Sequence, residues 1–270
     1  MNLYVKVRKD VKIFVEDLNS ESEHTILFIH GWPLNHNMWE YQVGYLIELG
    51  YRCVTIDLRG YGQSDRPTNG YDYDTMASDI KGVIDSLKLN NITLVGHSMG
   101  GAIAVRYIAK YNAHAVSKLC LLSAAVPSFS PTENWEYGTP EDKVDYYIAE
   151  SYSDRPHLIT EIKNIFFHQF VTSETAQWFT NLCLQASGWA TAKSLAALGS
   201  EHLFNDVKQI QIPTLILHGI YDKICPIEFA IYMNENIKDS KLIRLYQSGH
   251  GAFFEQKAEV SKEIDKFARR

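Results

Sequence analysis

The chain has 270 residues, of which 46% are hydrophobic and 21% charged, and its formal net charge is −6 at pH 7. A chain of this length and apolar content can bury one large core as a single domain. The negative charge argues against nucleic acid or an anionic membrane as a standing partner. A transmembrane helix needs about 18 or more consecutive apolar residues, and the sequence contains no such run.

Short apolar runs and helical patterns alternate along the first half of the chain. Two strands near residues 3–8 and 11–16 are predicted to form an antiparallel edge. The first of them alternates in polarity and lacks the continuous apolar core of a signal peptide. Further strands are predicted at 25–29, 51–56, 92–95 and 119–123, with helices near 38–49, 74–87 and 102–109. This alternation indicates βαβ units, in which a parallel sheet is covered on both faces.

The strand pattern stops after residue 123 and resumes only near residue 212. The sequence between these points is rich in aromatic residues and shows helical patterns at 141–151, 156–170, 173–186 and 190–198. Because loops in open α/β sheets gather over the carboxyl ends of the strands, residues 124–199 are predicted to form a helical cap. The core then comprises residues 1–123 and 200–270, in the same structural domain as the cap.

A single serine framed by glycines follows the predicted strand at 92–95. Gly96, Ser98 and Gly100 form a Gly-x-Ser-x-Gly pattern that leads into the predicted helix. In this strand–turn–helix context the pattern is typical of a nucleophile elbow, which strains the serine backbone and projects the hydroxyl above the sheet edge. A Cβ at either glycine would collide with the turn. Ser98 is therefore predicted to be a nucleophile.

A serine nucleophile needs a base, and a nucleophile elbow requires the chain order serine, acid, histidine. Asp222 stands just past the end of a predicted strand at 212–217. His250 follows the predicted strand at 241–246 and lies in a loop between two glycines. Both are predicted to form a catalytic triad with Ser98, in which the imidazole accepts the serine proton and the carboxylate fixes the imidazole tautomer.

Other titratable residues suit these roles less well. Asp206 precedes the strand that leads to the predicted acid, which places it at the wrong edge of the sheet. His30 and His218 end strands beside glycine and are interpreted as packing or loop-shaping residues. Asp57 and Arg59 lie in a glycine-containing loop that lacks the spacing and the lysine of a phosphate-binding loop. These two side chains are predicted to pair and to brace the oxyanion region.

Two backbone N–H groups are predicted to form an oxyanion hole. Met99 follows the nucleophile at a helix amino terminus, where its N–H can face developing negative charge. The second N–H is expected from the loop after the third strand. There Gly31 allows close approach of the backbone, Trp32 is placed to donate, and Pro33 stiffens the loop. A tight turn with a core tryptophan is the alternative interpretation.

Similar motifs extend almost from end to end of the chain. They read HGWPL at 30–34, MW at 38–39, DLRGYGQSDRP at 57–67, YDYDT at 71–75, GHSMGG at 96–101, HGIYD at 218–222 and GHG at 249–251. With them the chain resembles the α/β-hydrolase superfamily and, within it, the bacterial aryl esterases and cofactor-free haloperoxidases (perhydrolases). The resemblance implies an α/β-hydrolase fold, with a mostly parallel eight-stranded sheet flanked by helices. Many members of this branch carry phenylalanine where this chain has His97.

The predicted cap offers a large supply of apolar side chains. Pro33, Phe129, Phe166, Phe170 and Ile224 are predicted to line a substrate pocket. Ligand pockets are mostly apolar with a few polar groups, although each aromatic residue could instead pack the cap onto the core. Because the cap shows no cluster of arginine or lysine, the expected substrate is a small or medium uncharged ester, aryl esters included.

Cysteine usage points to a reducing compartment. The four cysteines fit no metal-binding spacing and are predicted to be buried, reduced thiols of a cytoplasmic protein. Neither a metal ion nor a cofactor is predicted. The expected partner is a small-molecule substrate, and the sequence leaves homo-oligomerisation open.

The predicted function is therefore that of a serine esterase, which acts through an acyl-enzyme. Hydrogen peroxide in place of water would give a peracid, and thus perhydrolase or haloperoxidase side activity. Two alternatives remain open at this point. The same triad can hydrolyse carbon–carbon bonds of dienoic diketones, and proteins of this fold with slow turnover can serve as small-molecule receptors or signalling partners.

Overall fold

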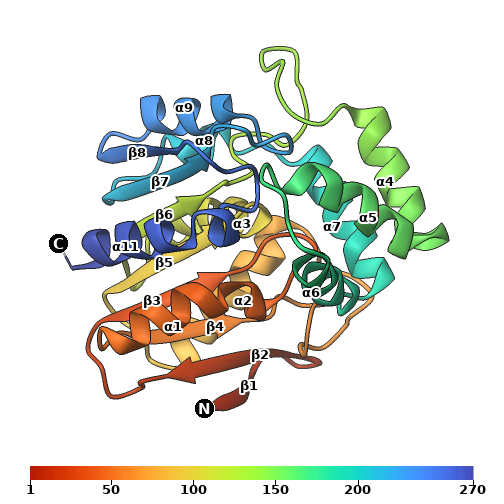
Figure 1. The fold of residues 1–270 in the computed structure, drawn as a ribbon. Coiled ribbons are helices and arrows are strands. Elements are labelled where there is room, and N and C mark those ends of the chain that lie inside the picture. The colour runs from red at the N-terminus through yellow and green to blue at the C-terminus, as the bar shows by residue number, and fades with distance from the viewer. Residues whose placement is uncertain (270) are drawn as a thin grey trace.

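A computed structural model of the chain describes residues 1–269 and contains one eight-stranded sheet (Figure 1). The strands are β1 (Asn2–Arg8), β2 (Val11–Leu18), β3 (Thr25–Ile29), β4 (Arg52–Ile56), β5 (Ile92–His97), β6 (Val116–Leu122), β7 (Thr214–Gly219) and β8 (Ser240–Leu245). Their order in the sheet is β1-β2-β4-β3-β5-β6-β7-β8. The pairs β1–β2 and β2–β4 are antiparallel, and the other pairs are parallel. The predicted fold class is confirmed.

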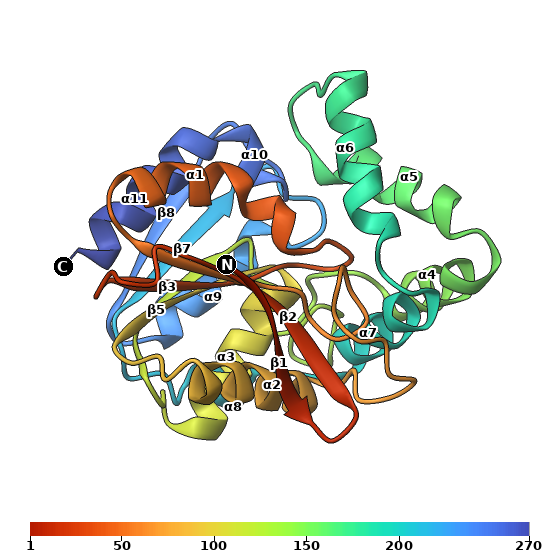
Figure 2. The same cartoon turned by 90° about the horizontal axis from the view of Figure 1, so that it is seen from below.

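Helices cover both faces of this sheet (Figure 2). One face carries α1 (Glu40–Glu48), α10 (Ala252–Glu255) and α11 (Lys257–Ala268), and the other carries α2 (Tyr73–Ser86), α3 (Met99–Tyr111) and α8 (Phe204–Val207). A further helix, α9 (Ile227–Asn236), packs on β7 and β8. Every residue of β3, β5 and β7 is buried, as expected for parallel strands covered on both sides. Within residues 1–269, no helix combines the length and apolarity needed to cross a membrane.

Five helices lie between β6 and β7 in the sequence, and the first four of them lie beside the carboxyl ends of the parallel strands in space (Figure 1). These cap helices are α4 (Glu141–Ser153), α5 (Arg155–Phe166), α6 (Ser173–Leu184) and α7 (Gly188–Ser200). The predicted helix at 156–170 is too long, because the backbone becomes extended at Phe167. The division of the chain into a core and a cap at residues 124–199 stays a prediction, and Arg270 lies outside the described residues.

The predicted pairing of Arg59 with Asp57 is wrong. Asp57 instead accepts hydrogen bonds from the backbone N–H and the Nδ1 of His36, both at 2.8 Å, and from Gln63 N–H, also at 2.8 Å. Arg59 reaches α2, where its Nε and Nη2 each donate to a carboxylate oxygen of Asp79 at 2.6 Å. Asp57 therefore stabilises the loop after β4 through its hydrogen bonds, and the Arg59–Asp79 ion pair separately connects this loop to α2.

The Arg59–Asp79 pair yields a prediction about stability. Both side chains are only 2% exposed, so Asp79→Ala leaves a buried guanidinium without its counter-ion. We expect the free energy of unfolding, measured with urea, to fall by about 3–5 kcal/mol. The double variant Arg59→Met/Asp79→Leu removes both charges and should be clearly more stable than the single variant. A loss below about 1 kcal/mol in Asp79→Ala would contradict this account of the pair.

Candidate active site

Ser98 stands at a sharp turn between β5 and α3. Its backbone has φ 52° and ψ −120°, a conformation that L-residues rarely adopt. An added Cβ at Gly96 would lie 2.5 Å from the carbonyl oxygen of Gly100, and one at Gly100 would lie 2.5 Å from the carbonyl oxygens of Ile29 and His30. Only glycine therefore fits at either position, and the strand–turn–helix geometry is that of a nucleophile elbow.

The loops after β7 and β8 bring Asp222 and His250 together. His250 Nδ1 lies 2.7 Å from Asp222 Oδ2, and both side chains are buried. The other carboxylate oxygen, Oδ1, accepts hydrogen bonds from the N–H groups of Ile224 and Cys225, both at 2.9 Å. These two bonds fix the carboxylate plane and leave Oδ2 to the imidazole. His250 Nδ1 therefore carries the proton in this bond, and Nε2 is free to act as an acceptor.

Two further histidines surround this pair. His218 Nε2 donates to the carbonyl oxygen of Cys225 at 2.7 Å and lies 3.6 Å from Asp222 Oδ2. His97 Nε2 donates to the carbonyl oxygen of His250 at 3.0 Å, and the two rings lie 4.8 Å apart. Burial lowers the pKa of both His97 and His218. Both are thus neutral packing and hydrogen-bonding residues, and only His250 has its ring bonded to a carboxylate at the site.

The predicted oxyanion-hole residues lie beside the serine. A Cβ added to Gly31 would lie 3.0 Å from Ser98 Cβ, which shows how closely this loop approaches the elbow. Trp32 is fixed by its indole Nε1, which donates to the carbonyl oxygen of Thr191 in α7 at 3.0 Å. Within residues 1–269, the backbone N–H groups of Trp32 and Met99 donate no hydrogen bond. Two buried donors therefore remain available near the serine.

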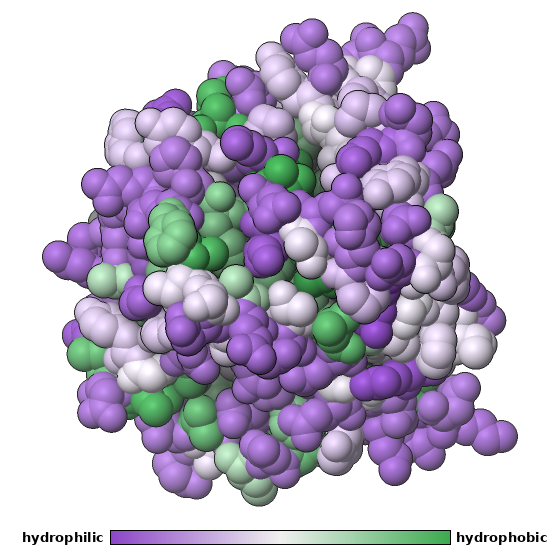
Figure 3. Space-filling model, turned by 45° about the vertical axis from the view of Figure 1, so that its right-hand side comes forward, coloured by the Kyte–Doolittle hydropathy of each residue, from purple (hydrophilic) through white to green (hydrophobic). Residues whose placement is uncertain are grey.

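A narrow apolar cavity joins these parts. Its volume is about 30 Å³, roughly the space of one or two water molecules. The residues that line it are Trp32, Ser98, Phe129, Thr139, Tyr147, Ile162, Ile165, Phe166, Leu195, Leu198, Ile224 and His250. Seen from the cap side, hydrophilic side chains cover most of the molecular surface and hydrophobic ones show only in scattered patches (Figure 3). The large apolar groups at the serine are thus enclosed beneath the cap helices.

The structure corrects two of the five predicted pocket residues. Phe129, Phe166 and Ile224 line the cavity beside Ser98. Phe170 does not, because α5 ends before it and its side chain is 92% exposed. Pro33 is buried but is absent from the lining, because the turn at this loop brings Trp32 to the cavity instead.

Sequence reasoning missed the aliphatic part of the lining. Ile162 and Ile165 are three residues apart on α5, and Leu195 and Leu198 are three residues apart on α7. This spacing places each pair on one helix face, so helical periodicity within the cap could have identified them. Thr139 and Tyr147 add hydroxyl groups, and no sequence pattern marks either one. Among residues 1–269, no group of three or more His, Cys, Asp or Glu side chains is arranged to hold a metal ion.

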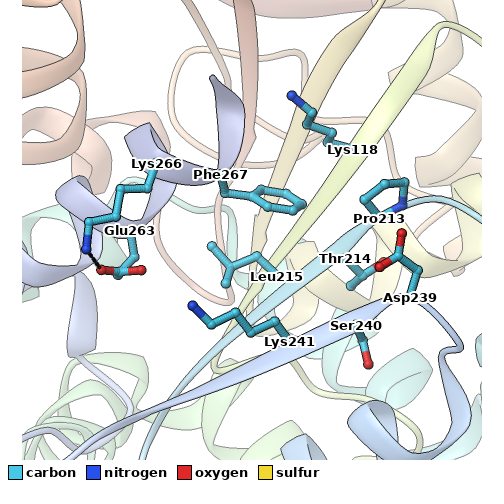
Figure 4. Close-up of a pocket in the computed structure, with 10 residues that line it drawn as sticks. All are labelled: Lys118, Pro213, Thr214, Leu215, Asp239, Ser240, Lys241, Glu263, Lys266 and Phe267. Carbon is cyan, nitrogen blue, oxygen red and sulfur yellow. Dashed lines mark hydrogen bonds and ion pairs between the residues drawn. The ribbon is translucent and has the colours of Figure 1, made fainter. Parts of the chain in front are cut away.

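A larger depression of about 280 Å³ lies elsewhere, at the amino ends of β7 and β8 (Figure 4). Lysines and acidic residues surround it, but two of the lysines are engaged. Lys118 Nζ donates to the carbonyl oxygen of Ala268 at 2.7 Å, and Lys266 pairs with Glu263. None of the residues predicted for the triad or the oxyanion hole lines this depression, so it does not belong to the candidate site.

The fold and the elbow place this chain in a known class of proteins. Residues 24–257 match the family described as alpha/beta hydrolase fold. The AB hydrolase superfamily protein YisY of Bacillus subtilis (strain 168) is 46% identical over 268 residues, and the match covers 99% of each chain. The chain therefore belongs to the α/β-hydrolase family, as its motifs predicted.

Two solved structures resemble the chain over its whole length. The esterase EaEST from Exiguobacterium antarcticum is 42% identical, with a TM-score of 0.97. A bromoperoxidase from Bacillus anthracis is 30% identical, with a TM-score of 0.95. Both matches cover 100% of each chain. These relatives fall in the esterase and haloperoxidase branch that the sequence motifs indicated.

Proposed function

We propose that the protein is a serine carboxylic ester hydrolase with Ser98, His250 and Asp222 as its catalytic triad. One observation carries the proposal: the strained Ser98 shares an enclosed apolar cavity with His250, whose Nδ1 is hydrogen-bonded to Asp222. Serine becomes an effective nucleophile only when a neutral imidazole accepts its proton. The carboxylate holds the imidazole in the tautomer that this step requires.

The reaction follows from these positions. His250 Nε2 takes the proton of the Ser98 hydroxyl as Oγ bonds to the ester carbonyl carbon, and the carbonyl oxygen becomes an oxyanion. The N–H groups of Trp32 and Met99 stabilise that charge. The imidazolium then protonates the departing alkoxide oxygen as the ester C–O bond breaks, leaving the acyl group on Ser98. Water, deprotonated by the same imidazole, attacks this ester, and the carboxylic acid and free serine are released.

The lining of the cavity indicates the substrate class. It offers aliphatic and aromatic side chains and no arginine or lysine, so it suits an uncharged acyl group. The cavity volume of about 30 Å³ favours small acyl groups, and larger ones require the lining side chains or cap helices to move. The likeness to a bromoperoxidase supports a second use of the acyl-enzyme, in which hydrogen peroxide replaces water and the product is a peracid.

The first test is reaction with a fluorophosphonate probe, followed by peptide mass spectrometry. We expect a single covalent adduct on Ser98, together with turnover of p-nitrophenyl acetate that is lost in His250→Ala. Peracid formation is measured separately by adding hydrogen peroxide to the same assay. Folded protein that is neither labelled nor active would contradict the esterase proposal.

Two other functions give different results in the same assays. Labelling at Ser98 with no turnover of any short ester, but cleavage of a dienoic diketone, would favour carbon–carbon bond hydrolysis. Tight binding of a small molecule with very slow turnover would favour a receptor. A small-molecule partner is common to all three proposals, whereas a cytoplasmic location and a homo-oligomeric state stay predictions.

A further inference from the structure

The loop that carries His250 is fastened to the cap by the side chain of Glu255. Glu255 is the last residue of α10, just after the loop. Its Oε2 accepts a hydrogen bond from Gly249 N–H at 2.8 Å. Its Oε1 accepts from the N–H groups of His168 and Gln169, both at 2.6 Å. One carboxylate thus bonds at the same time to the His250 loop and to the segment 167–172 that joins α5 to α6.

Additional hydrogen bonds join the same two segments. Gly251 N–H donates to the carbonyl oxygen of Phe166 at 3.0 Å. The side-chain amide of Gln169 donates to the carbonyl oxygen of Gln247 at 2.6 Å. The end of α5 and the residues after it therefore lie directly on the loop, and the carboxylate of Glu255 closes one side of this contact.

The glycines beside His250 are explained by this close approach. A Cβ at Gly249 would lie 3.0 Å from the backbone nitrogen of His168, and one at Gly251 would lie 2.5 Å from the ring of Phe167. Larger residues at either position would push the cap segment away from the loop. The two glycines of the Gly-His-Gly sequence thus allow the His250 loop to pack directly against the cap.

The carboxylate of Glu255 is suited to hold these segments for a physical reason. Burial raises its pKa, which means that the surrounding protein disfavours the charged form. Three backbone N–H groups lower the pKa of Glu255, because each donates a hydrogen bond to the charged carboxylate. Such charge-assisted bonds are among the stronger hydrogen bonds in proteins. Glutamate is the residue that satisfies all three donors at once, with two oxygens that face different segments.

We propose that Glu255 is a positioning residue for His250, which it orients by tying the backbone of the His250 loop to the cap. The inference rests on the proposed function, in which His250 is the base. The base must hold its Nδ1–H on Asp222 and its Nε2 on the serine, and small displacements of such groups cost much of the rate. The same contact joins the cap, which encloses the substrate, to the residue that moves the proton.

The test compares Glu255→Gln with Glu255→Ala. The glutamine side chain keeps the shape of glutamate but has only one oxygen. Whichever way the amide turns, its NH2 group faces backbone N–H on one of the two segments, so the tie is broken on that side. We expect kcat for p-nitrophenyl acetate, per fluorophosphonate-reactive serine, to fall about ten- to a hundredfold in both variants, with KM changed less than about threefold. Glu235→Gln, an exposed residue of α9, is the matched control and should leave both constants unchanged.

A spectroscopic measurement separates positioning from a general loss of structure. The Nδ1–H proton of His250, hydrogen-bonded to Asp222, should give a low-field proton signal in the wild type that is absent in His250→Gln. We expect this signal to shift or broaden in both Glu255 variants while circular dichroism stays that of the folded protein. An unchanged signal with kcat within about twofold of the wild type would overturn the proposal.

Two further outcomes have distinct meanings. A higher KM with unchanged kcat also overturns the proposal, because Glu255 would then hold the cap without affecting the base. If the wild type neither turns over esters nor reacts at Ser98, the proposed function fails instead. The proton signal needs no substrate, so it still shows whether Glu255 controls the position of His250.

Discussion

Ser98→Ala is expected to lower kcat for p-nitrophenyl acetate by about 10⁵-fold or more and to abolish labelling by a fluorophosphonate. The reason is that Ser98 is the only serine among the described residues that line the cavity. Ser98 and His250 line it together, while the hydroxyl-bearing Thr139 and Tyr147 belong to the cap side. Removal of Oγ therefore leaves the N–H groups of Trp32 and Met99 in place but no atom to form the acyl-enzyme of the proposed mechanism. Circular dichroism and urea unfolding should show that the variant is folded.

The matched control for that variant is Ser200→Ala. Ser200 is exposed at the end of α7, and its hydroxyl donates only to the carbonyl oxygen of Ala196 one turn earlier. Turnover and labelling of this variant should equal those of the wild type. Ester hydrolysis that survives in Ser98→Ala at more than about a hundredth of the wild-type rate would show that another residue is the nucleophile.

The fold was predictable because its signals are local and strong. The buried strands are short apolar runs, and helices of clear periodicity separate them, so the parallel sheet follows from alternation alone. The elbow was also visible as a motif. A Cβ at Gly96 would clash with Gly100 and Gly101 within the same turn, whereas glycine at position 100 is required by the carbonyl oxygens of Ile29 and His30, which are distant in the sequence. Local sequence is enough wherever the physical constraint is itself local.

The wrong prediction for Asp57 and Arg59 arose because each side chain prefers a partner that is distant in the sequence over its near neighbour. Asp57 and Arg59 are two residues apart, yet the carboxylate bonds to His36 and the guanidinium bonds to Asp79 on α2. Phe170 is predicted to line the pocket as one of the apolar aromatic residues of the cap, but its side chain is exposed. Helix α5 ends at Phe166, whose carbonyl oxygen accepts a hydrogen bond from Gly251 N–H.

The role of Glu255 could not be predicted either, because it depends on partners that are distant in the sequence. Its three donors belong to Gly249 near it in the chain and to His168 and Gln169 more than 80 residues before it. Nothing in the sequence around Glu255 distinguishes it from the exposed acidic residues of a surface helix. The sequence places His250 in a loop between two glycines, and the packing of the cap shows that these glycines allow a close contact.

Asp222→Asn is expected to lower kcat by about 10⁴-fold while leaving the protein folded. The surrounding hydrogen bonds dictate how the amide is oriented. Oδ1 accepts from the N–H groups of Ile224 and Cys225, so the amide oxygen of the variant must take that position. The NH2 group then faces His250 Nδ1, which can only accept. The imidazole proton moves to Nε2, where it faces Ser98 and prevents the ring from taking the serine proton.

Asp206→Asn provides the control, because Asp206 is the alternative acid that the sequence offers just before the strand that leads to Asp222. Its carboxylate lies 2.9 Å from Arg106 Nε, on the α3 side of the sheet and away from the cavity. This variant should keep kcat within about threefold of the wild type, at some cost in stability from the weakened ion pair. Loss of activity in Asp206→Asn with retention in Asp222→Asn would reverse the assignment of the acid. The low-field proton signal of His250 decides the mechanism, since the tautomer argument requires it to vanish in Asp222→Asn and to remain in Asp206→Asn.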